Sequence, residues 1–224
     1  MNTGFSVICV TNKDHTLQNI MDNFVRQDYW NKELIVVLND DHMDENHWRH
    51  TSSRFGDVSI FKLPQHTTLG TCLNFAIDRR KFHYIARMDD DDFYGYNYLQ
   101  NTMKTFQEHH ADVVARQDFF MYVADKQTLH IRHTSDHMIG GSIAFHERIL
   151  SAVRFHDVSQ AEDNRFYEDA HRCGFNVQMP SHYNDFVYIR NSPNNKHTWQ
   201  PDEESLYYST KYVTHTDYFY QYLS

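Results

Sequence analysis

The feature that most constrains the fold is an alternation of short apolar segments with helix-patterned segments across the first half of the chain. Four apolar segments have the length and β-branched content of buried strands, namely residues 5–11, 33–38, 58–63 and 82–88. The segments between them place apolar residues at helical spacing, as in Leu17, Ile20, Met21 and Phe24. This alternation predicts an α/β fold, in which helices cover both faces of a parallel sheet.

The second half of the chain has more strand-like segments and fewer helices. Strands are expected at residues 112–116, 119–123, 128–133, 175–179 and 186–190. A short helix is expected near 147–153, and a longer one over 162–173 with Gly174 at its C-terminal cap. The Tyr-rich segment 202–223 is predicted to be helical. No repeat or linker divides the sequence, so residues 1–224 are predicted to form a single domain.

Composition excludes several classes of protein. Lys+Arg 21 against Asp+Glu 30 gives a net charge of −9, whereas a general nucleic-acid-binding protein needs a basic face. The 40% apolar fraction argues against wholesale disorder, and no run of about 18 apolar residues is present to span a bilayer. The polar N-terminus does not resemble a signal peptide, and three widely spaced cysteines indicate a reducing compartment. We therefore expect a cytoplasmic protein, with peripheral attachment to a membrane left open.

Four consecutive carboxylates, Asp89 to Asp92, directly follow the apolar segment 82–88. One interpretation is a solvated acidic turn that favours the start of a following helix. The other is a metal site, because ligands bind at the carboxyl ends of parallel strands and carboxylate oxygens suit Mg²⁺ or Mn²⁺. In both interpretations we expect the run to be exposed.

A second acidic pair, Glu162 and Asp163, opens the helix expected over 162–173. The pair could stabilise the first turn of that helix by interaction with its dipole. Alternatively, one carboxylate points into the ligand crevice and acts as a general base.

Taken in order, these segments resemble the inverting nucleotide-sugar glycosyltransferases of the GT-A fold, of the family 2 type. The resemblance rests on five stretches between about residues 5 and 180: SVICVTNK at 6–13, ELIVVLND at 33–40, LNFAI at 73–77, YIARMDDDD at 84–92, and Glu162-Asp163 followed by Arg172 and Gly174. It implies a Rossmann-like, nucleotide-sugar-binding half over about 1–110, with a mostly parallel central sheet. It also implies an acceptor-binding, catalytic half over about 111–200, followed by the Tyr-rich segment 201–224.

The same resemblance implies roles for the acidic residues. Asp91 would bind a divalent metal, Mn²⁺ or Mg²⁺, and Asp89 would contact the ribose or metal-bound water. Asp90 is included in the donor site because the four-residue run leaves the register open by one position. Asp40 would read the nucleobase and Thr11 would line the same pocket, although the sequence Asn39-Asp40-Asp41-His42 departs from the family pattern. Asp163 would be the catalytic base.

The late segment 190–199 is a second place where the resemblance implies donor contacts. Arg190 and Lys196 would bind the diphosphate, and His197 would complete the metal shell or contact the diphosphate from a mobile lid. The alternative for His197 is an ordinary solvent-exposed position. The tyrosines after residue 201 could pack on the domain, form a surface for homo-oligomers, or provide an aromatic platform for the acceptor.

Together, these features predict a metal-dependent, inverting glycosyltransferase. It would move a sugar, most simply from a UDP-sugar, to a glycan or another hydroxyl acceptor. One alternative is a sugar-phosphate nucleotidyltransferase, which is disfavoured because residues 11–15 lack the Gly-rich loop of that class. The other alternative is a nucleotide-sugar-binding module without activity.

Overall fold

The computed structural model describes residues 3–134, 138–181, 184–191 and 203–223. Its centre is a seven-stranded sheet in the order β10-β6-β9-β4-β1-β2-β3. These strands are β1 (Phe5–Thr11), β2 (Lys32–Leu38), β3 (Val58–Lys62), β4 (Tyr84–Arg87), β6 (Val113–Val114), β9 (Ala144–His146) and β10 (Val177–Gln178). Strands β1 to β4 are parallel, and β9 is antiparallel to both of its neighbours, β4 and β6.

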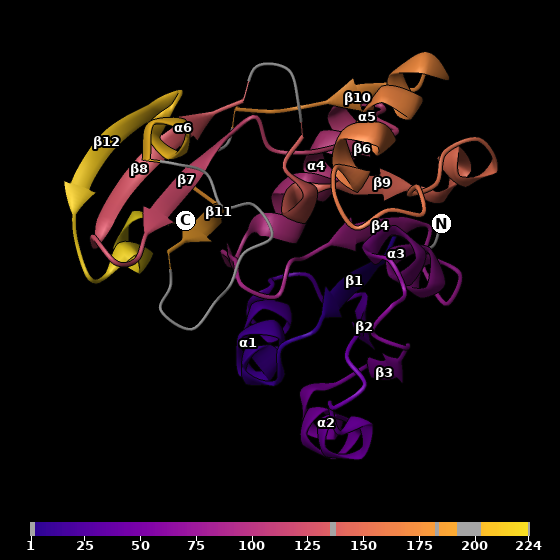
Figure 1. The fold of residues 1–224 in the computed structure, drawn as a ribbon. Helices are drawn as coiled ribbons and strands as arrows, with labels where there is room; N and C mark the ends of the chain where they lie inside the picture. Colours follow the sequence, from indigo (N-terminus) through magenta and orange to yellow (C-terminus); the bar gives the residue numbers. More distant parts are fainter. Residues whose placement is uncertain (1–2, 135–137, 182–183, 192–202, 224) are drawn as a thin grey trace.

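Helices cover both faces of this sheet (Figure 1). On one face lie α1 (Leu17–Arg26), α2 (Glu45–Ser52) and α4 (Tyr98–His109), and on the other lie α3 (Leu69–Ile77) and α5 (Glu162–Arg172). Because both faces are covered, side chains of opposite orientation in β1, such as Val7 and Ile8, are both fully buried. This explains why the strands read as continuous apolar segments rather than as alternating ones.

A second, five-stranded sheet lies beside the first, in the order β12-β8-β7-β11-β5 (Figure 1). It consists of β5 (Phe93–Tyr94), β7 (Asp118–Val123), β8 (Thr128–His133), β11 (Phe186–Arg190) and β12 (Thr210–His215). The remaining elements are a short helix, α6 (Glu203–Tyr207), and 3₁₀ turns at Asp14–Thr16, Ser53–Phe55, Gly140–Ser142, Glu147–Ser151 and Phe219–Tyr222.

The expected α/β fold with a mostly parallel sheet is confirmed. The segment 202–223 is not a continuous helix, because β12 pairs antiparallel with β8. The short helix expected near 147–153 is present as a 3₁₀ helix over Glu147–Ser151. The acidic run leads into strand β5, so the interpretation in which it starts a helix is wrong. None of the described helices is long and apolar enough to cross a membrane.

Candidate active site

A cavity of about 930 Å³ lies at the carboxyl ends of β1, β2 and β4. Its walls come from the loops after those strands and after β3, from α3, from the segment 138–140, from the residues before and within the first turn of α5, and from the side of the second sheet formed by β8 and β11. Parallel sheets bind ligands at this edge because successive loops converge there. Asp89, Asp90 and Asp91 therefore line the same cavity as Glu162 and Asp163, which are more than 70 residues away in sequence.

The acidic run is not uniformly exposed, contrary to expectation. Asp90 and Asp92 are buried, with 5% and 0% of their surface exposed, whereas Asp89 and Asp91 are partly accessible. The loop is held by amides of α1, since Asn19 donates to the carbonyl oxygens of Asp90 and Asp92. The run is therefore a folded turn in which Asp89, Asp90 and Asp91 border the cavity, Asp90 with little exposed surface, while Asp92 does not line it.

Lys13 and Thr11 contact the acidic run from the end of β1. Lys13 Nζ lies 3.0 Å from an oxygen of Asp90 and 2.8 Å from an oxygen of Asp91, and Thr11 Oγ1 donates to Asp90 over 2.5 Å. Burial, together with the charge of Asp91, raises the pKa of Asp90 to about 6, although Lys13 and Thr11 oppose this rise. Burial tends to lower the pKa of Lys13, but the two carboxylates outweigh it and raise that pKa.

Asp92 points away from this cluster, toward the second sheet. Its Oδ1 accepts a hydrogen bond from the backbone N–H of Ile189 at 3.0 Å and lies 3.8 Å from Nη1 of Arg190. Burial raises its pKa well above the ordinary value. Asp92 therefore ties the acidic turn to β11 rather than presenting a carboxylate to the cavity.

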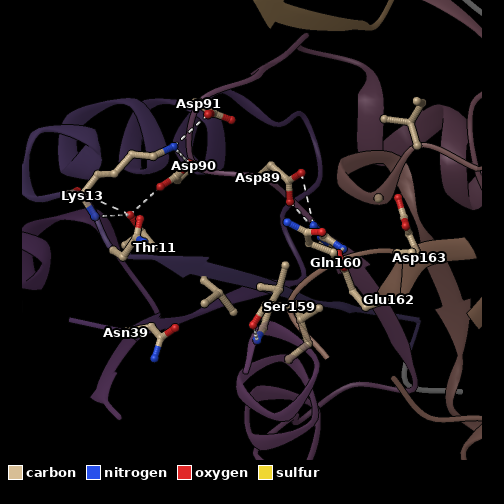
Figure 2. Close-up of a pocket in the computed structure, with 18 of the residues that line it drawn as sticks. Thr11, Lys13, Asn39, Asp89, Asp90, Asp91, Ser159, Gln160, Glu162 and Asp163 are labelled. Carbon is tan, nitrogen blue, oxygen red and sulfur yellow. Dashed lines mark hydrogen bonds and ion pairs between the residues drawn. The ribbon is translucent and has the colours of Figure 1, made fainter. Parts of the chain in front are cut away.

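The opposite wall carries the second acidic pair (Figure 2). Ala161, just before α5, has a left-handed backbone with φ of 56°, which is uncommon for a residue with a Cβ. Glu162 is buried and forms an ion pair of 2.9 Å with Arg87. Asp163 lines the cavity and accepts a hydrogen bond from the backbone N–H of Asn164. Burial raises the pKa of Asp163, and the positive charge of Arg87 works against that rise.

The end of β2 presents Asn39, rather than Asp40, to the cavity. Asn39 donates its side-chain amide to the carbonyl oxygen of Pro64 at 2.8 Å, and Figure 2 shows its side-chain oxygen turned toward the cavity. Asp40 instead accepts a hydrogen bond from the backbone N–H of His42, and it is not among the residues that line the cavity. Of these two side chains, Asn39 lines the cavity and Asp40 does not.

Arg190 lines the cavity from the end of β11, with its guanidinium 3.0 Å above the ring of Tyr188. Burial lowers its pKa from the usual value, while the nearby carboxylates work in the opposite direction. Lys196 and His197, the other two residues expected in the late segment, lie outside the described residues.

The carboxylates of the acidic run are oxygen ligands of the kind that Mg²⁺ and Mn²⁺ bind. In the described part of the chain, no three His, Cys, Asp or Glu side chains form a closed metal site. Mg²⁺ and Mn²⁺, however, are often held by one or two carboxylates together with substrate phosphates and water. The ammonium of Lys13 between Asp90 and Asp91 marks a point where positive charge is favoured. Asp91 is one of those carboxylates, and it borders the cavity.

Lys13, Arg87 and Asn39 also line the cavity. The sequence places all three at or within two residues of the carboxyl end of a parallel strand, but it gave Lys13 and Arg87 no role and left open whether Asn39 or a neighbour reads the base. Arg87 had a usable signal, since an arginine inside an otherwise apolar strand must find a counter-charge when buried.

The fold and the cavity define a glycosyltransferase of the GT-A class. The sequence matches glycosyl transferase family 2 across residues 6–177, so the chain belongs to that family. A comparison with curated protein sequences finds no match.

Solved structures agree with this fold. S. aureus TarS 1–349 in complex with UDP-GlcNAc superposes with a TM-score of 0.70 and 16% identity, over 92% of this chain and 64% of TarS 1–349. The mannosyltransferase PcManGT from Pyrobaculum calidifontis, in complex with GDP-Man and Mn²⁺, gives a TM-score of 0.65 and 16% identity, over 83% of this chain and 56% of PcManGT. The chain thus spans less than two thirds of these neighbours, and identities this low establish the fold alone.

Proposed function

We propose that this enzyme transfers a sugar from a UDP-sugar to a hydroxyl acceptor with inversion at the anomeric carbon, assisted by Mn²⁺ or Mg²⁺. The observation that carries the proposal is that one cavity joins an acidic cluster after β4 to a separate carboxylate, Asp163, at the start of α5. The first fits a metal–diphosphate group, and the second fits the hydroxyl that attacks it. Membership of a glycosyltransferase family favours sugar transfer over nucleotidyl transfer.

On the donor side, Asp91 is the residue proposed to hold the metal, with Asp89 near the ribose or metal-bound water. A bound metal would stabilise the negative charge that develops on the leaving diphosphate. Arg190, which is buried at the cavity wall, is proposed to bind that diphosphate through its guanidinium. Thr11 and Asp90 are proposed to shape the donor site from beneath, since they hydrogen-bond each other.

For the nucleobase, we now propose Asn39 in place of Asp40. Its side-chain oxygen faces the cavity and can accept the ring N–H of uracil, while its amide is held by Pro64. TarS is described with UDP-GlcNAc and PcManGT with GDP-Man, so the base must be determined directly.

On the acceptor side, Asp163 is the proposed general base. Glu162 is engaged in a buried ion pair with Arg87, whereas the ion pairs of the described residues do not include Asp163. A carboxylate whose pKa is raised by burial takes a proton more readily than an exposed one. A single displacement by the acceptor needs no carboxylate nucleophile, and this predicts inversion.

The test compares Asp163→Asn with Glu162→Gln. Donor hydrolysis is first assayed with UDP-GlcNAc, UDP-glucose and GDP-mannose, with and without Mn²⁺, because turnover separates an enzyme from a binding module. Asp163→Asn is expected to leave UDP affinity close to wild type while lowering turnover about 10²–10⁴-fold. Asp91→Asn should show the opposite pattern, losing Mn²⁺-dependent UDP binding. Near-normal turnover in Asp163→Asn beside an inactive Glu162→Gln would assign the base to Glu162 instead.

A further inference from the structure

Arg87, the last residue of β4, connects the two acidic motifs of the cavity. Its Nε donates to Oδ1 of Asp89 at 2.7 Å, and its Nη1 donates to Oε1 of Glu162 at 2.9 Å. Arg87 is only 6% exposed and Glu162 is also buried, so their ion pair is shielded from solvent, whereas the side chain of Asp89 is 30% exposed at the cavity. One guanidinium thus contacts both the loop after β4 and the first residue of α5.

The surroundings of Arg87 are shaped to hold the guanidinium in this position. A Cβ added at Gly140 would lie 2.8 Å from Nη1 of Arg87, so a side chain at residue 140 would push the guanidinium out of its present position. The other oxygen of Asp89 lies 3.0 Å from the corresponding position at Gly141, and the hydroxyl of Tyr94 accepts a hydrogen bond from the backbone N–H of Asp89. Asp89 and Arg87 are therefore fixed together from three sides.

We infer that Arg87 is a positioning residue that sets the distance between the donor-binding carboxylates and the acceptor-binding start of α5. This inference rests on the proposed function, in which Asp89 belongs to the donor site and Asp163, next to Glu162, is the base. A guanidinium suits this role because its rigid fork presents separate N–H groups to two carboxylates, whereas an ammonium is a single point charge. Figure 2 shows Asp89 on one side and Glu162 and Asp163 on the other, as the bridge requires.

The consequence for the reaction is geometric. If the two motifs move apart by even about 1 Å, the base no longer meets the attacking hydroxyl in line, and losses near 10²-fold are typical. Binding of the nucleotide depends on the donor side alone and is largely retained. A residue that only stabilised the fold would instead lower stability, affinity and turnover together.

The experiment uses Arg87→Lys in the full chain, with Arg80→Lys as a matched control. Arg80 pairs with Glu147 at 2.7 Å and is not among the residues that line the cavity. Arg87→Lys keeps one positive charge but reaches only one of the two carboxylates. We expect its Tm to fall, because a buried carboxylate loses part of its counter-charge, and its UDP affinity with Mn²⁺ to stay near wild type, while kcat for UDP-GlcNAc hydrolysis falls about 10–100-fold. If another donor from the panel is hydrolysed faster, that donor is used. Arg80→Lys should leave all three unchanged.

A second variant moves Arg87 without altering any charge. Gly140→Ala introduces the Cβ that conflicts with the guanidinium, and it should reproduce the fall in kcat with UDP affinity retained. Combining Arg87→Lys with Glu162→Gln should cost less than the product of the two single effects, because both break the same bridge.

Wild-type kcat in both Arg87→Lys and Gly140→Ala would overturn the inference, as would parallel losses of Tm, affinity and kcat in both. The proposed function fails differently: the wild-type enzyme would then hydrolyse no donor, or Asp163→Asn would remain active.

Discussion

Lys13 places its ammonium between two carboxylates of the acidic run, 3.0 Å from Asp90 and 2.8 Å from Asp91. Four neighbouring carboxylates repel one another strongly unless a cation is present. In the free protein the ammonium of Lys13 supplies part of the positive charge that offsets this repulsion. A divalent ion that binds Asp91 must share that carboxylate with Lys13 or displace the ammonium. The lysine is therefore expected to oppose metal binding when no nucleotide is present.

The variant Lys13→Met tests this competition. Removing a positive charge within a few ångströms of the ligand oxygens should raise the affinity for Mn²⁺ alone by about tenfold or more at pH 8, since each tenfold corresponds to about 1.4 kcal/mol. Calorimetric titration with Mn²⁺ measures it, with Lys104→Met as the control because Lys104 is an exposed residue of α4. Unchanged or weaker Mn²⁺ binding in Lys13→Met would mean that the lysine helps, rather than competes with, the metal.

Asp90 gives the stability of the metal-free protein a defined dependence on pH. Its pKa is about 6 in the folded protein against an ordinary 3.8, so between these values the folded state binds more protons than the unfolded state. Stability conferred by Asp90 is therefore greatest below pH 4 and falls as pH rises through 6, by about 3 kcal/mol at most. In EDTA, Asp90→Asn should raise Tm at pH 7 and flatten its fall between pH 4 and pH 7. Asp92 and Asp163 shift in the same direction in both proteins, so an identical slope in the variant would exclude Asp90 as the source.

Within the site, the sequence predicted positions better than it predicted side-chain orientation. Three residues of the acidic run, Asp89 to Asp91, line one cavity with Glu162 and Asp163, as their places at a strand end and a helix start indicated. Alternation along the chain could not show that Asp90 and Asp92 turn inward, because amides of α1 fix that loop through contacts distant in sequence. Likewise, Asn39 is held at the cavity by its hydrogen bond to Pro64, which lies 25 residues later, while Asp40 bonds to the backbone of His42.

At the scale of elements, the sequence predicted a helix or strand correctly where the segment itself has a clear apolar periodicity. The apolar stripe of α1 and the β-branched runs of β1 and β2 were evident in sequence, and helix α5 spans Glu162–Arg172 close to its expected bounds. Strand β12 was missed because its alternation is weak: Val213 is partly buried, whereas Tyr212 and Lys211 are exposed. The segment is a strand because its backbone pairs antiparallel with β8, which lies about 80 residues earlier in the sequence.

Several tyrosines are exposed in and around β12: Tyr212 lies in the strand, Tyr208 lies just before it and Tyr218 just after it. Packing of this segment on the domain comes from a few residues instead: Leu206 and Phe219 are buried, and Phe219 contacts Phe93 and Tyr122. The buried contacts thus come from α6 and the 3₁₀ turn at Phe219–Tyr222, on either side of β12, whereas no residue of β12 itself is buried.

For the molecule as a whole, the cavity depends on how the two sheets are joined. Arg116 follows β6 of the first sheet and Asp185 precedes β11 of the second, and the two form an ion pair of 2.8 Å in which neither side chain is exposed. Helix α4 encloses the pair, since Thr102 accepts a hydrogen bond from Arg116 and Asn101 donates one to Asp185. The sheets therefore share a buried, fully enclosed contact in addition to their apolar packing.

Removing one partner of this pair should be costly for both sheets together. Arg116→Met leaves Asp185 buried without a counter-charge, which typically lowers the free energy of unfolding by about 3–5 kcal/mol. The double variant Arg116→Met/Asp185→Asn removes both charges and should recover part of the loss, because no unpaired charge remains. Urea unfolding followed by far-ultraviolet circular dichroism and by tryptophan fluorescence measures both the free energy and its cooperativity. If the ion pair joins the sheets, the two signals of Arg116→Met coincide at a lower urea midpoint. A decrease in the free energy of unfolding below about 1 kcal/mol would instead mean that apolar packing holds the two sheets together. Separate transitions would show that the second sheet unfolds independently.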